Sequence, residues 1–273
     1  MAMPNKEKIV LIGAGNAATH LAAALQENGY PIAGIYSRSS QAAETLAAKI
    51  GCIPFTDFRH LPEADIYLYC VKDDVLPVLA ATIAPLHSAA LHLHTAGSIS
   101  IDIFKGHCLC YGVLYPLQTF SKARPVNFKE IPCFAEACNE ETLKAVVRLG
   151  ESLSEQVHTL NSERRRYLHL SAVFANNFAN HCFALAQEII SQKVLLPTDV
   201  LSPLIRETVN KLNTMTAKAA QTGPAARNDQ SVMNAQAELL NSIPAIKAFY
   251  ENASQSIVSA TQSTDQISKL SKT

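Results

Sequence analysis

The stretch KIVLIGAGNAATHLAAALQENG (Lys8–Gly29) decides the fold. Its first part is a short β-branched, apolar run that ends in glycines, which predicts a buried strand. Its second part, Asn16–Asn28, is rich in alanine and leucine and ends at a glycine, as helices commonly do. The turn between them, Gly13–Ala18, fits the pattern G-x-G-x-x-G/A. This pattern often arises by chance, but between a strand and a helix it predicts a dinucleotide-binding turn.

Each small residue of this turn has a physical role in such a site. Gly13 permits the tight turn, Gly15 lets a pyrophosphate approach the backbone, and Ala18 allows the helix to pack closely on the strand. The backbone N–H groups of Gly15, Asn16 and Ala17, together with the helix dipole, are expected to hold the phosphates. The alternative is a glycine turn that binds no ligand.

The end of the second expected strand selects between the two nicotinamide cofactors. NAD sites usually carry an acidic residue about 20 positions after the glycines, where it binds the ribose hydroxyls. The sequence here is Tyr36-Ser37-Arg38-Ser39-Ser40, without an acid. Arg38 can pair with a 2′-phosphate, and Ser37 and Ser39 can donate to its oxygens, so we expect NADP(H). Alternatively, Arg38 is solvated and a serine caps the next helix.

Strand-like and helix-like segments alternate along the first half of the chain. Further strands are expected at Pro31–Ser37, Cys52–Phe55, Asp65–Val71, Ala90–Ala96, Cys108–Leu117, Ile131–Ala137 and Glu155–Leu160, and helices at Ser40–Ile50, Asp74–Leu86 and Glu140–Leu153. This alternation predicts βαβ units and a parallel sheet.

From about Ser162 the strand signals stop and the periodicity becomes helical. Helices are expected at residues 162–194, 198–220, 230–243 and 244–262. We therefore predict an α/β protein whose N-terminal Rossmann domain, residues 1–160, has a doubly wound, mainly parallel sheet and binds NADP. Residues 161–273 are expected to form an all-α domain for substrate binding or dimerisation.

Two turns are expected at the carboxyl edge of the sheet, where a Rossmann ligand binds. The predicted cofactor contacts in these turns are Val71, Lys72, Asp73, Thr95 and Ala96. Asp73 or Asp74 is also a good N-cap for the following helix. For His94, a place in the site and a place in the core remain equally open.

Composition excludes several classes of function. The chain has 23 basic and 23 acidic residues without a basic stripe, so a nucleic-acid partner is not expected. No apolar run is long enough to span a bilayer, and the N-terminus lacks a signal-peptide pattern, so we expect a cytoplasmic protein. The seven cysteines form no CxxC pair, which favours free thiols and no metal site.

Five motifs, spread in order over most of the chain, carry a resemblance to a known family. They are GAGNAA (Gly13–Ala18), HTAGS (His94–Ser98), GVLYPLQTF (Gly112–Phe120), HLSAVFANNF (His169–Phe178) and TGPAARND (Thr222–Asp229). The chain is similar to a bacterial family of Rossmann-like NADP oxidoreductases, related to deazaflavin-dependent NADP oxidoreductases. It resembles more broadly the superfamily of 6-phosphogluconate dehydrogenase, ketopantoate reductase and pyrroline-5-carboxylate reductase.

The resemblance implies a helical half that forms a homodimer by intertwined packing, and an active cleft between the two halves. The cleft would be lined by the HTAGS turn, the YPLQTF segment, the start of the long helix and the TGPAARND loop. The substrate contacts expected there are Gln118, Asn177, Thr222 and Arg227. For Arg227, the alternative is a surface salt bridge.

One departure from the superfamily concerns the proton donor. Its hydroxyacid dehydrogenases carry a catalytic lysine on the long helix, one turn before an asparagine. Here Ala172 and Val173 take that place, and no lysine occurs between Glu163 and Gln192. His169 precedes Asn176 by seven positions and so shares its helix face, which makes His169 a candidate proton donor. The alternative is a helix-face histidine that packs on the other domain.

These observations predict an NADPH-dependent oxidoreductase that acts on a small carbonyl or imine, with His169, Asn176 and His94 as candidate catalytic residues. The missing lysine motivates the alternative of a non-catalytic NADP-binding redox sensor or regulatory dimer. An NAD-linked hydroxyacid dehydrogenase is disfavoured by Arg38 as well as by the missing lysine.

Overall fold

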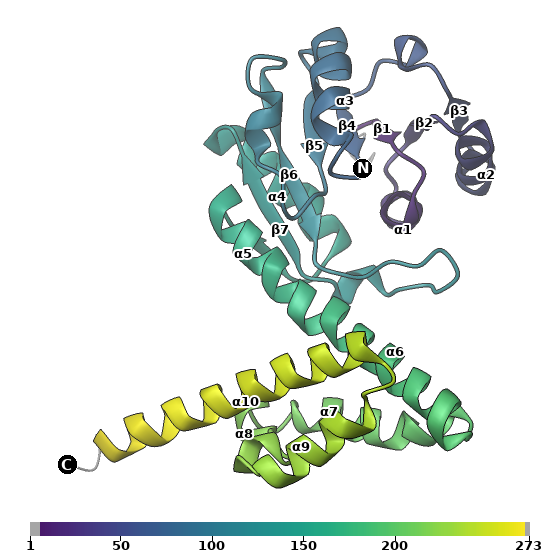
Figure 1. Ribbon diagram of the computed structural model, residues 1–273. Helices are drawn as coiled ribbons and strands as arrows, with labels where there is room; N and C mark the ends of the chain where they lie inside the picture. The colour runs from purple at the N-terminus through teal and green to yellow at the C-terminus, as the bar shows by residue number, and fades with distance from the viewer. Residues whose placement is uncertain (1–5, 271–273) are drawn as a thin grey trace. The chain divides into compact units, whose positions relative to one another are not determined.

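The computed structural model describes residues 6–270, with side chains up to residue 262 (Figure 1). The chain divides into two compact units, one up to Phe178 and one from Ala179. The first unit contains the sheet, and the second is entirely helical. From the sequence we assign NADP binding to residues 1–160 and substrate binding or dimerisation to residues 161–273. This assignment of roles stays a prediction.

One eight-stranded sheet forms the centre of the first unit. Its order is β3-β2-β1-β4-β5-β6-β7-β8, and every neighbouring pair is parallel except β6–β7. The strands are β1 (Ile9–Ile12), β2 (Ile32–Tyr36), β3 (Ile53–Phe55), β4 (Ile66–Tyr69), β5 (Leu91–His94), β6 (Cys110–Pro116), β7 (Cys133–Ala137) and β8 (Val157–Thr159). The predicted fold, a mainly parallel Rossmann sheet followed by helices, is confirmed.

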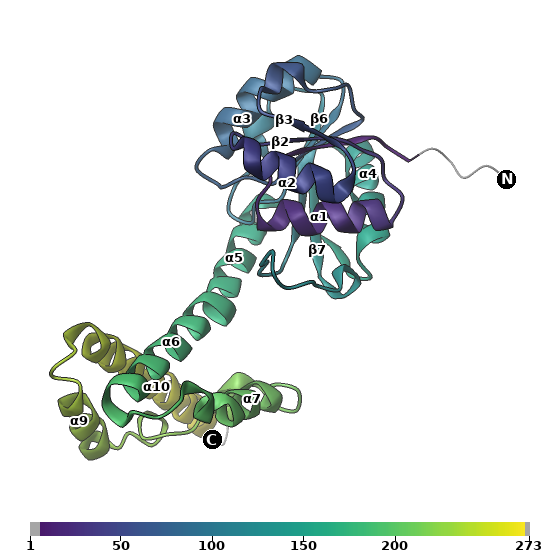
Figure 2. The same ribbon diagram turned by 90° about the vertical axis from the view of Figure 1, so that its right-hand side faces the viewer.

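Helices cover both faces of this sheet, so the central strands β1 and β4 are buried along their whole length. One face packs against α1 (Asn16–Glu27), α2 (Ser40–Ile50) and α4 (Glu140–Leu153) in a single apolar core. Figure 2 shows α1 and α2 side by side on that face. The opposite face packs against α3 (Leu76–Ile83) and the 3₁₀ turn η3 (Ile101–Phe104).

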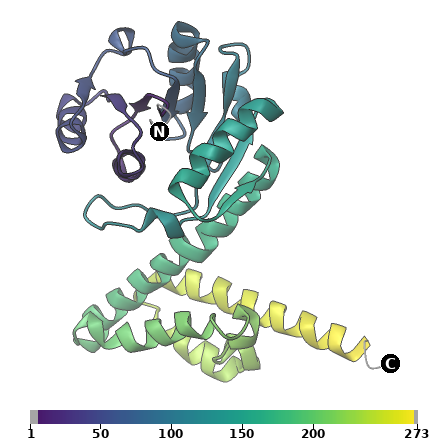
Figure 3. The same cartoon turned by 180° about the vertical axis from the view of Figure 1, so that it is seen from behind.

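The strand order reverses between β1 and β4, which lie side by side although β2 and β3 separate them in the sequence. A doubly wound sheet binds its ligand at such a point, outside the carboxyl ends of the strands. The turns after β1, β2 and β4 therefore meet where a ligand is expected. From behind, Figure 3 also shows the long loop between β6 and β7 projecting from the sheet.

The long helix predicted from residue 162 to 194 is interrupted. It consists of α5 (Ser162–Ala172), a π-helical segment η5 (Val173–Phe178), α6 (Ala179–Ile189) and a second π-helical segment η6 (Ile190–Val194). A π-turn adds one residue to a turn without changing the apolar character of the sequence, so periodicity alone could not locate it.

The remaining helices of the second unit follow the predicted segments with shifted limits. They are α7 (Ser202–Lys211), α8 (Ala217–Ala220), α9 (Gln230–Leu239) and α10 (Pro244–Leu270). The single helix expected at residues 198–220 is wrong, because a 3₁₀ turn, η7 (Thr198–Leu201), precedes α7 and a turn separates α7 from α8.

A buried ion pair fixes α5 on the sheet. The Arg165 side chain is fully buried and pairs with Glu136 of β7, whose side chain is 15% exposed. The Arg165 guanidinium also donates to the carbonyl oxygen of Ile99, in the loop after β5. The backbone N–H and hydroxyl of Ser162 donate to the same carboxylate over 2.8 Å each. Because the Glu136 carboxylate oxygens accept these hydrogen bonds, the charges of the buried pair are compensated.

Two histidines of β5, His92 and His94, lie in the core. Both are fully buried, and the His94 ring stacks on Phe104. Burial lowers the pKa of His92 to about 4. Burial, and next the charge of Arg165, lower the pKa of His94 to about 3. Both rings are therefore neutral at physiological pH, and the structure places His94 in the core.

These two rings should make the protein sensitive to acid. An unfolded histidine titrates near pH 6.5, so between about pH 6.5 and 3 the unfolded state binds protons that the folded state excludes. Stability is then complete above about pH 6.5 and falls as the pH decreases. For His94→Asn, whose amide oxygen can accept the same backbone bond, the loss between about pH 7.5 and 5 should be smaller by about 2 kcal/mol.

Urea unfolding at the two pH values measures this difference. His60→Asn is the matched control, because the His60 side chain is 77% exposed. An unchanged pH dependence in His94→Asn would contradict the assignment of His94 to the core.

Candidate functional site

The turn between β1 and α1 has the geometry that its glycines predict. Gly13 has a φ of 120°, and its N–H donates to the carbonyl oxygen of Tyr36 over 2.7 Å. A Cβ atom at Gly13 would lie 2.4 Å from the carbonyl oxygen of Cys70. Both the backbone conformation and the contact with the end of β4 therefore require glycine at this position.

The N-terminus of α1 is open. Gly15 is its N-cap and provides no side-chain cap, and the first turn contains no acidic residue. A Cβ atom built on Gly15 would meet no atom within 4 Å. The free N–H groups of this turn and the positive end of the helix dipole form a suitable anion site.

A groove of about 870 Å³ lies along this turn. Its lining comes from the turns after β1, β2 and β4 and from the starts of α1 and α3: Gly13, Ala14, Gly15, Asn16, Tyr36, Ser37, Arg38, Ser39, Cys70, Val71, Lys72, Val75 and Leu79. Two of these side chains, Arg38 and Lys72, are cationic, and none of the described lining residues is acidic. The Arg38 guanidinium is exposed and makes no hydrogen bond or ion pair with any described residue. The groove thus offers positive charge without a protein counter-ion.

The serines beside Arg38 have local structural roles as well. The Ser39 hydroxyl accepts from the N–H of Ala42 and caps α2, as the alternative interpretation of this segment expects. The Ser37 hydroxyl accepts from the N–H of Ser39 over 3.2 Å. Each hydroxyl accepts from the backbone and keeps its O–H to donate, so both serines can still contribute to a phosphate site beside the unpaired guanidinium of Arg38.

These features fit a nicotinamide dinucleotide. Gly15 would hold the pyrophosphate at the N-terminus of α1, and Arg38 and Lys72 supply positive charge to the same groove. The cofactor residues predicted from Gly13 to Asn16, from Ser37 to Ser39 and at Val71 and Lys72 line this groove together.

Four predicted cofactor residues lie outside the groove lining: Ala17, which lines a neighbouring cavity, and Asp73, Thr95 and Ala96. Asp73 accepts a hydrogen bond from the Ser98 hydroxyl. The Thr95 hydroxyl donates to the carbonyl oxygen of Tyr69 over 3.2 Å, and the N–H of Ala96 donates to Nδ1 of His94 over 3.1 Å. These groups hold the two turns in place, so their contact with a cofactor stays a prediction.

The expectation that Asp73 or Asp74 caps the following helix is wrong. Helix α3 begins only at Leu76, its N-cap is Val75, and no side chain caps it. The reason is local: Pro77 occupies the first turn, where its missing N–H costs nothing, and Asp73 is engaged by Ser98 instead.

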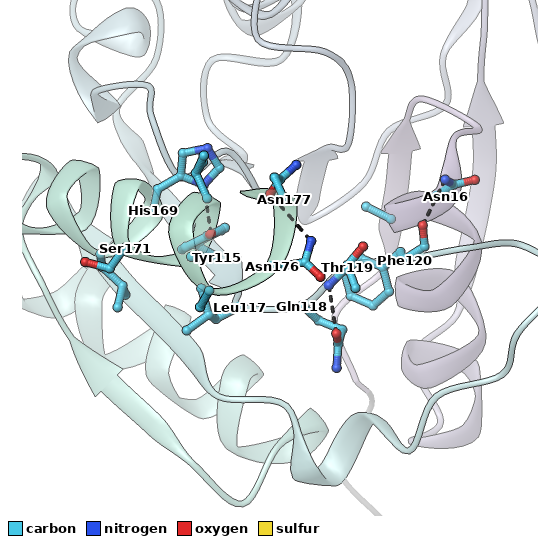
Figure 4. A pocket seen from close by; sticks show the side chains of 15 residues that line it. Asn16, Tyr115, Leu117, Gln118, Thr119, Phe120, His169, Ser171, Asn176 and Asn177 are labelled. Atoms are coloured by element: carbon cyan, nitrogen blue, oxygen red, sulfur yellow. Dashed lines mark hydrogen bonds between the residues drawn. The ribbon is translucent and has the colours of Figure 1, made fainter. Parts of the chain in front are cut away.

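A second cavity, of about 640 Å³, lies within the first unit and shares Asn16 with the groove. It is lined by Asn16, Ala17, Tyr115, Leu117, Gln118, Thr119, Phe120, Leu168, His169, Ser171, Ala172, Val173, Ala175, Asn176 and Asn177. Figure 4 shows His169 and Tyr115 on one side, Asn16 and Phe120 on the other, and Asn176 and Asn177 between them. The cavity thus brings together four predicted catalytic or substrate residues: Gln118, His169, Asn176 and Asn177.

His169 is held by Tyr115 of β6. The sequence predicts that the YPLQTF segment, which begins with Tyr115, lines the site, but it does not predict the pairing of Tyr115 with His169. Nδ1 of His169 and the Tyr115 hydroxyl are 3.0 Å apart, within hydrogen-bond distance. Burial, and next the nearby Asp73 carboxylate, raise the pKa of Tyr115 to about 12, so its hydroxyl stays protonated at neutral pH. The motif around Tyr115 was the available signal, but its sequence does not reveal a partner 54 positions away.

Gly97, in the HTAGS turn, makes room for this pair. A Cβ atom at Gly97 would lie 2.7 Å from Nδ1 of His169 and 2.8 Å from Cζ of Tyr115. These distances are shorter than packed atoms allow, so only glycine lets the turn after β5 lie against both rings. The glycine of HTAGS is therefore explained by the site and not by a turn conformation.

The π-helical segment η5 brings neighbouring asparagines to one cavity. Asn176 and Asn177 both line it, as do Val173 and Ala175 of the same segment. A π-turn contains more residues than an α-turn, so consecutive side chains diverge less around the axis, and such turns are frequent at functional sites. The amide of Asn176 lies 3.5 Å from the Asn177 oxygen, a long and weak contact.

The loop after β6 closes the cavity beside α1. The Asn16 amide donates to the carbonyl oxygen of Phe120 over 2.9 Å, and the His20 ring stacks on Phe120 with centroids 5.2 Å apart. The Gln118 oxygen accepts from the N–H of Thr119 over 2.8 Å. Asn16 therefore links the glycine turn to the loop that carries Gln118.

The remaining predicted residues, Thr222 and Arg227, belong to the second unit, before and within the short turn η8 (Ala225–Arg227). Their role in substrate binding stays a prediction. Among the residues that the structure describes, no group of three or more His, Cys, Asp and Glu side chains could hold a metal ion. None of the described helices combines the length and the apolarity that a membrane span needs.

Two family models match parts of the chain. Residues 7–76 match the oxidoreductase family with an NAD-binding Rossmann fold, and residues 131–257 match a domain of unknown function, DUF2520. The first match covers the glycine turn and the end of β2 that line the groove. Comparison with curated proteins gives no match.

Solved structures extend this result over almost the whole chain. A protein from Bacteroides fragilis, described as a "putative NADP oxidoreductase", is 43% identical, with a TM-score of 0.88 over 93% of this chain and 99% of that chain. A pyrroline-5-carboxylate reductase from Coxiella burnetii (17% identity, TM-score 0.58, 95% and 98% coverage) shares the fold. So does an imine reductase from Myxococcus stipitatus in complex with NADP+ (14% identity, TM-score 0.60, 95% and 94% coverage).

The two reductases share so little sequence with this chain that they support only its fold. The 43% sequence identity with the Bacteroides fragilis protein shows that the two chains are homologous. With the Rossmann match, the open N-terminus of α1 and the cationic groove, the chain belongs to the same family of Rossmann-fold, dinucleotide-binding oxidoreductases as the Bacteroides fragilis protein.

Proposed function

We propose that this protein is an NADPH-dependent reductase of small carbonyl or imine compounds. One observation carries the proposal. The cationic groove along the glycine turn and the cavity that contains His169 both lie in the first unit and share Asn16 in their lining. A dinucleotide along the groove would direct its nicotinamide end toward that cavity. The Bacteroides fragilis relative, described as an NADP oxidoreductase, supports the same cofactor.

The choice of NADPH over NADH rests on Arg38. Its unpaired guanidinium lines the groove at the end of β2, where an NAD-specific site would carry a carboxylate. A guanidinium binds a phosphate through two parallel hydrogen bonds, which a ribose hydroxyl cannot match. Arg38 therefore favours the cofactor that carries a 2′-phosphate.

His169 is proposed as the proton donor. When bound, NADPH supplies a hydride, so the protein must supply a proton to the carbonyl oxygen or the imine nitrogen. In the protonated imidazole, Nδ1–H donates to the Tyr115 oxygen, and this leaves Nε2–H for the substrate. Tyr115 fixes the orientation of the ring, and Gly97 allows the turn after β5 to lie against it.

Asn176, Asn177 and Gln118 are proposed to orient the substrate. Their side chains line the cavity, and at least one polar atom of each is free of strong hydrogen bonds to protein. Correct placement of a carbonyl between a hydride and a proton donor contributes much of the rate of such a reaction.

We also propose that the second unit forms a homodimer. Of its described side chains, only Ala225, Met233, Leu240, Ile246 and Val258 are buried. Many larger apolar side chains are exposed: Val194, Leu195, Leu196, Val200, Leu204, Val209, Leu212, Met215, Val232, Leu239 and Phe249. So much exposed apolar surface requires a cover, and a second copy of the chain provides matching surface.

Arg38→Ala tests the cofactor assignment. Loss of the pairing with the phosphate should cost on the order of 1.5–3 kcal/mol and weaken NADPH binding roughly 10- to 100-fold. NADH binding should hardly change, because NADH carries no 2′-phosphate. Titration of both cofactors measures the effect, and Arg164→Ala, an exposed arginine of α5, is the control. Equal losses for both cofactors would contradict the assignment.

His169→Gln tests the proton donor. A lost general acid typically lowers kcat by about 10²- to 10⁴-fold, and NADPH binding should be unchanged. Tyr115→Phe should cause a smaller loss, because it keeps the imidazole and removes only its hydrogen bond. Steady-state reduction kinetics measure both variants, with His158→Gln on the exposed side of β8 as the control.

Unchanged turnover in His169→Gln would remove His169 from the mechanism. Tight NADPH binding without turnover of any carbonyl or imine by the wild type would instead support the alternative of an NADP-binding sensor.

The introduction of charged side chains on α7 tests dimerisation. The double variant Leu204→Glu, Val209→Glu replaces side chains that are 64% and 55% exposed and should convert a dimer into a monomer. Sedimentation of the wild type should give twice the chain mass. Leu109→Glu, 74% exposed in the first unit, is the control and should leave the dimer intact. A monomeric wild type at all concentrations would refute the proposal.

A further inference from the structure

Apart from His169, which is cationic only when protonated, the described residues that line the cavity next to the groove carry no formal charge. Among the described residues that line it there is no Lys, Arg, Asp or Glu. Its polar groups are four carboxamides, three hydroxyls and the imidazole of His169. The adjoining groove, in contrast, carries both Arg38 and Lys72. Permanent positive charge thus lines the groove where phosphates would bind, and the described lining of the cavity where the reacting compound would bind has none.

The nearest buried charge does not change this conclusion. Burial, then the Asp73 carboxylate and last Arg165 influence the pKa of Tyr115. Neither charged residue lines the cavity, and the Arg165 guanidinium is paired with Glu136. Its charge is therefore already neutralised within the protein and gives a bound anion little attraction.

The carboxamides offer a specific set of free polar atoms. The Gln118 oxygen is occupied by the N–H of Thr119, which leaves its –NH₂ group as a donor. The Asn16 amide is occupied by the carbonyl oxygen of Phe120, which leaves its oxygen as an acceptor. Donors and acceptors are thus both present, as a neutral carboxamide or hydroxyl of a ligand requires.

The rest of the lining is apolar and comes from Leu117, Phe120, Leu168, Ala172 and Val173. A carboxylate or phosphate that enters such a cavity gives up water and, apart from the protonated His169 needed for catalysis, gains only hydrogen bonds to neutral donors. A neutral group gives up less and can use donors and acceptors alike. The cavity therefore discriminates against anionic ligands.

We propose that the substrate is an uncharged aldehyde, ketone or imine that carries a carboxamide- or hydroxyl-like group and neither a carboxylate nor a phosphate. This inference rests on the proposed reductase function. It assigns Gln118, Asn176 and Asn177 to recognition of a neutral polar group and the apolar side chains to the body of the substrate.

A matched pair of aldehydes tests the inference. 4-Formylbenzamide and 4-formylbenzoate have nearly the same shape and differ in charge. In NADPH oxidation assays, kcat/KM should be roughly tenfold higher, or more, for the amide. Gln118→Lys adds a counter-ion for the carboxylate and should reduce this ratio severalfold. Ala123→Lys adds the same charge at an exposed position of the same loop, outside the cavity lining, and should leave the ratio unchanged.

The binding of the two aldehydes to the NADPH-saturated protein, measured by calorimetry, separates failure of this inference from failure of the reductase proposal. If neither aldehyde is reduced but the amide binds more tightly, the reductase function fails and the neutral cavity stands. Equal or tighter binding of 4-formylbenzoate, binding of neither aldehyde, or a ratio that Gln118→Lys and Ala123→Lys change equally would overturn the inference.

Discussion

The candidate site depends on the buried ion pair between Arg165 and Glu136. It fixes α5 against β7 and, through the carbonyl oxygen of Ile99, against the loop after β5. His169 lies one turn beyond Arg165 on the same helix face, so the anchor sets where the imidazole meets Tyr115. Removal of one partner of such a pair costs about 3–5 kcal/mol, because the other charge stays buried without compensation. Stability and the geometry of the site are therefore coupled in this helix.

A second constraint is the separation of charge between two adjoining hollows. The groove holds the N-terminus of α1, Arg38 and Lys72, all of which favour phosphate oxygens. Apart from His169, which would carry the transferable proton, the described residues that line the cavity beyond Asn16 have only neutral polar groups. A dinucleotide needs the first environment along its phosphates, and hydride transfer to a neutral carbonyl or imine needs no charge in the second beyond a transferable proton. The division matches the chemistry of the proposed reaction.

Much of the Rossmann half could be predicted because its signals are local. Gly13 and Gly15 mark one turn, and Arg38 marks the strand end that faces it, so the groove follows from short-range pattern and known topology. The cavity could be predicted only in part. The contact of Gly97 and Tyr115 with His169 joins three distant segments, and local pattern carries no information about it. The π-turn at Asn176 and the burial of His94 also depend on packing, because the same residues are compatible with a regular helix and an exposed strand end.

The lysine that is missing from the long helix connects the proposed mechanism with the proposed substrate. Ala172 and Val173, which occupy its expected place, both line the cavity, so their identity removes a cation from the site itself. The absence of this lysine has two linked consequences, one for the proton donor and one for the substrate. The proton must come from another group, and His169 and Tyr115 are the titratable side chains among the described lining residues. Tyr115 holds its proton firmly, since its pKa is raised to about 12, which leaves His169. Without that lysine an anionic substrate also finds no permanently charged cation among the described lining residues, so the change that favours an imidazole donor favours an uncharged substrate as well.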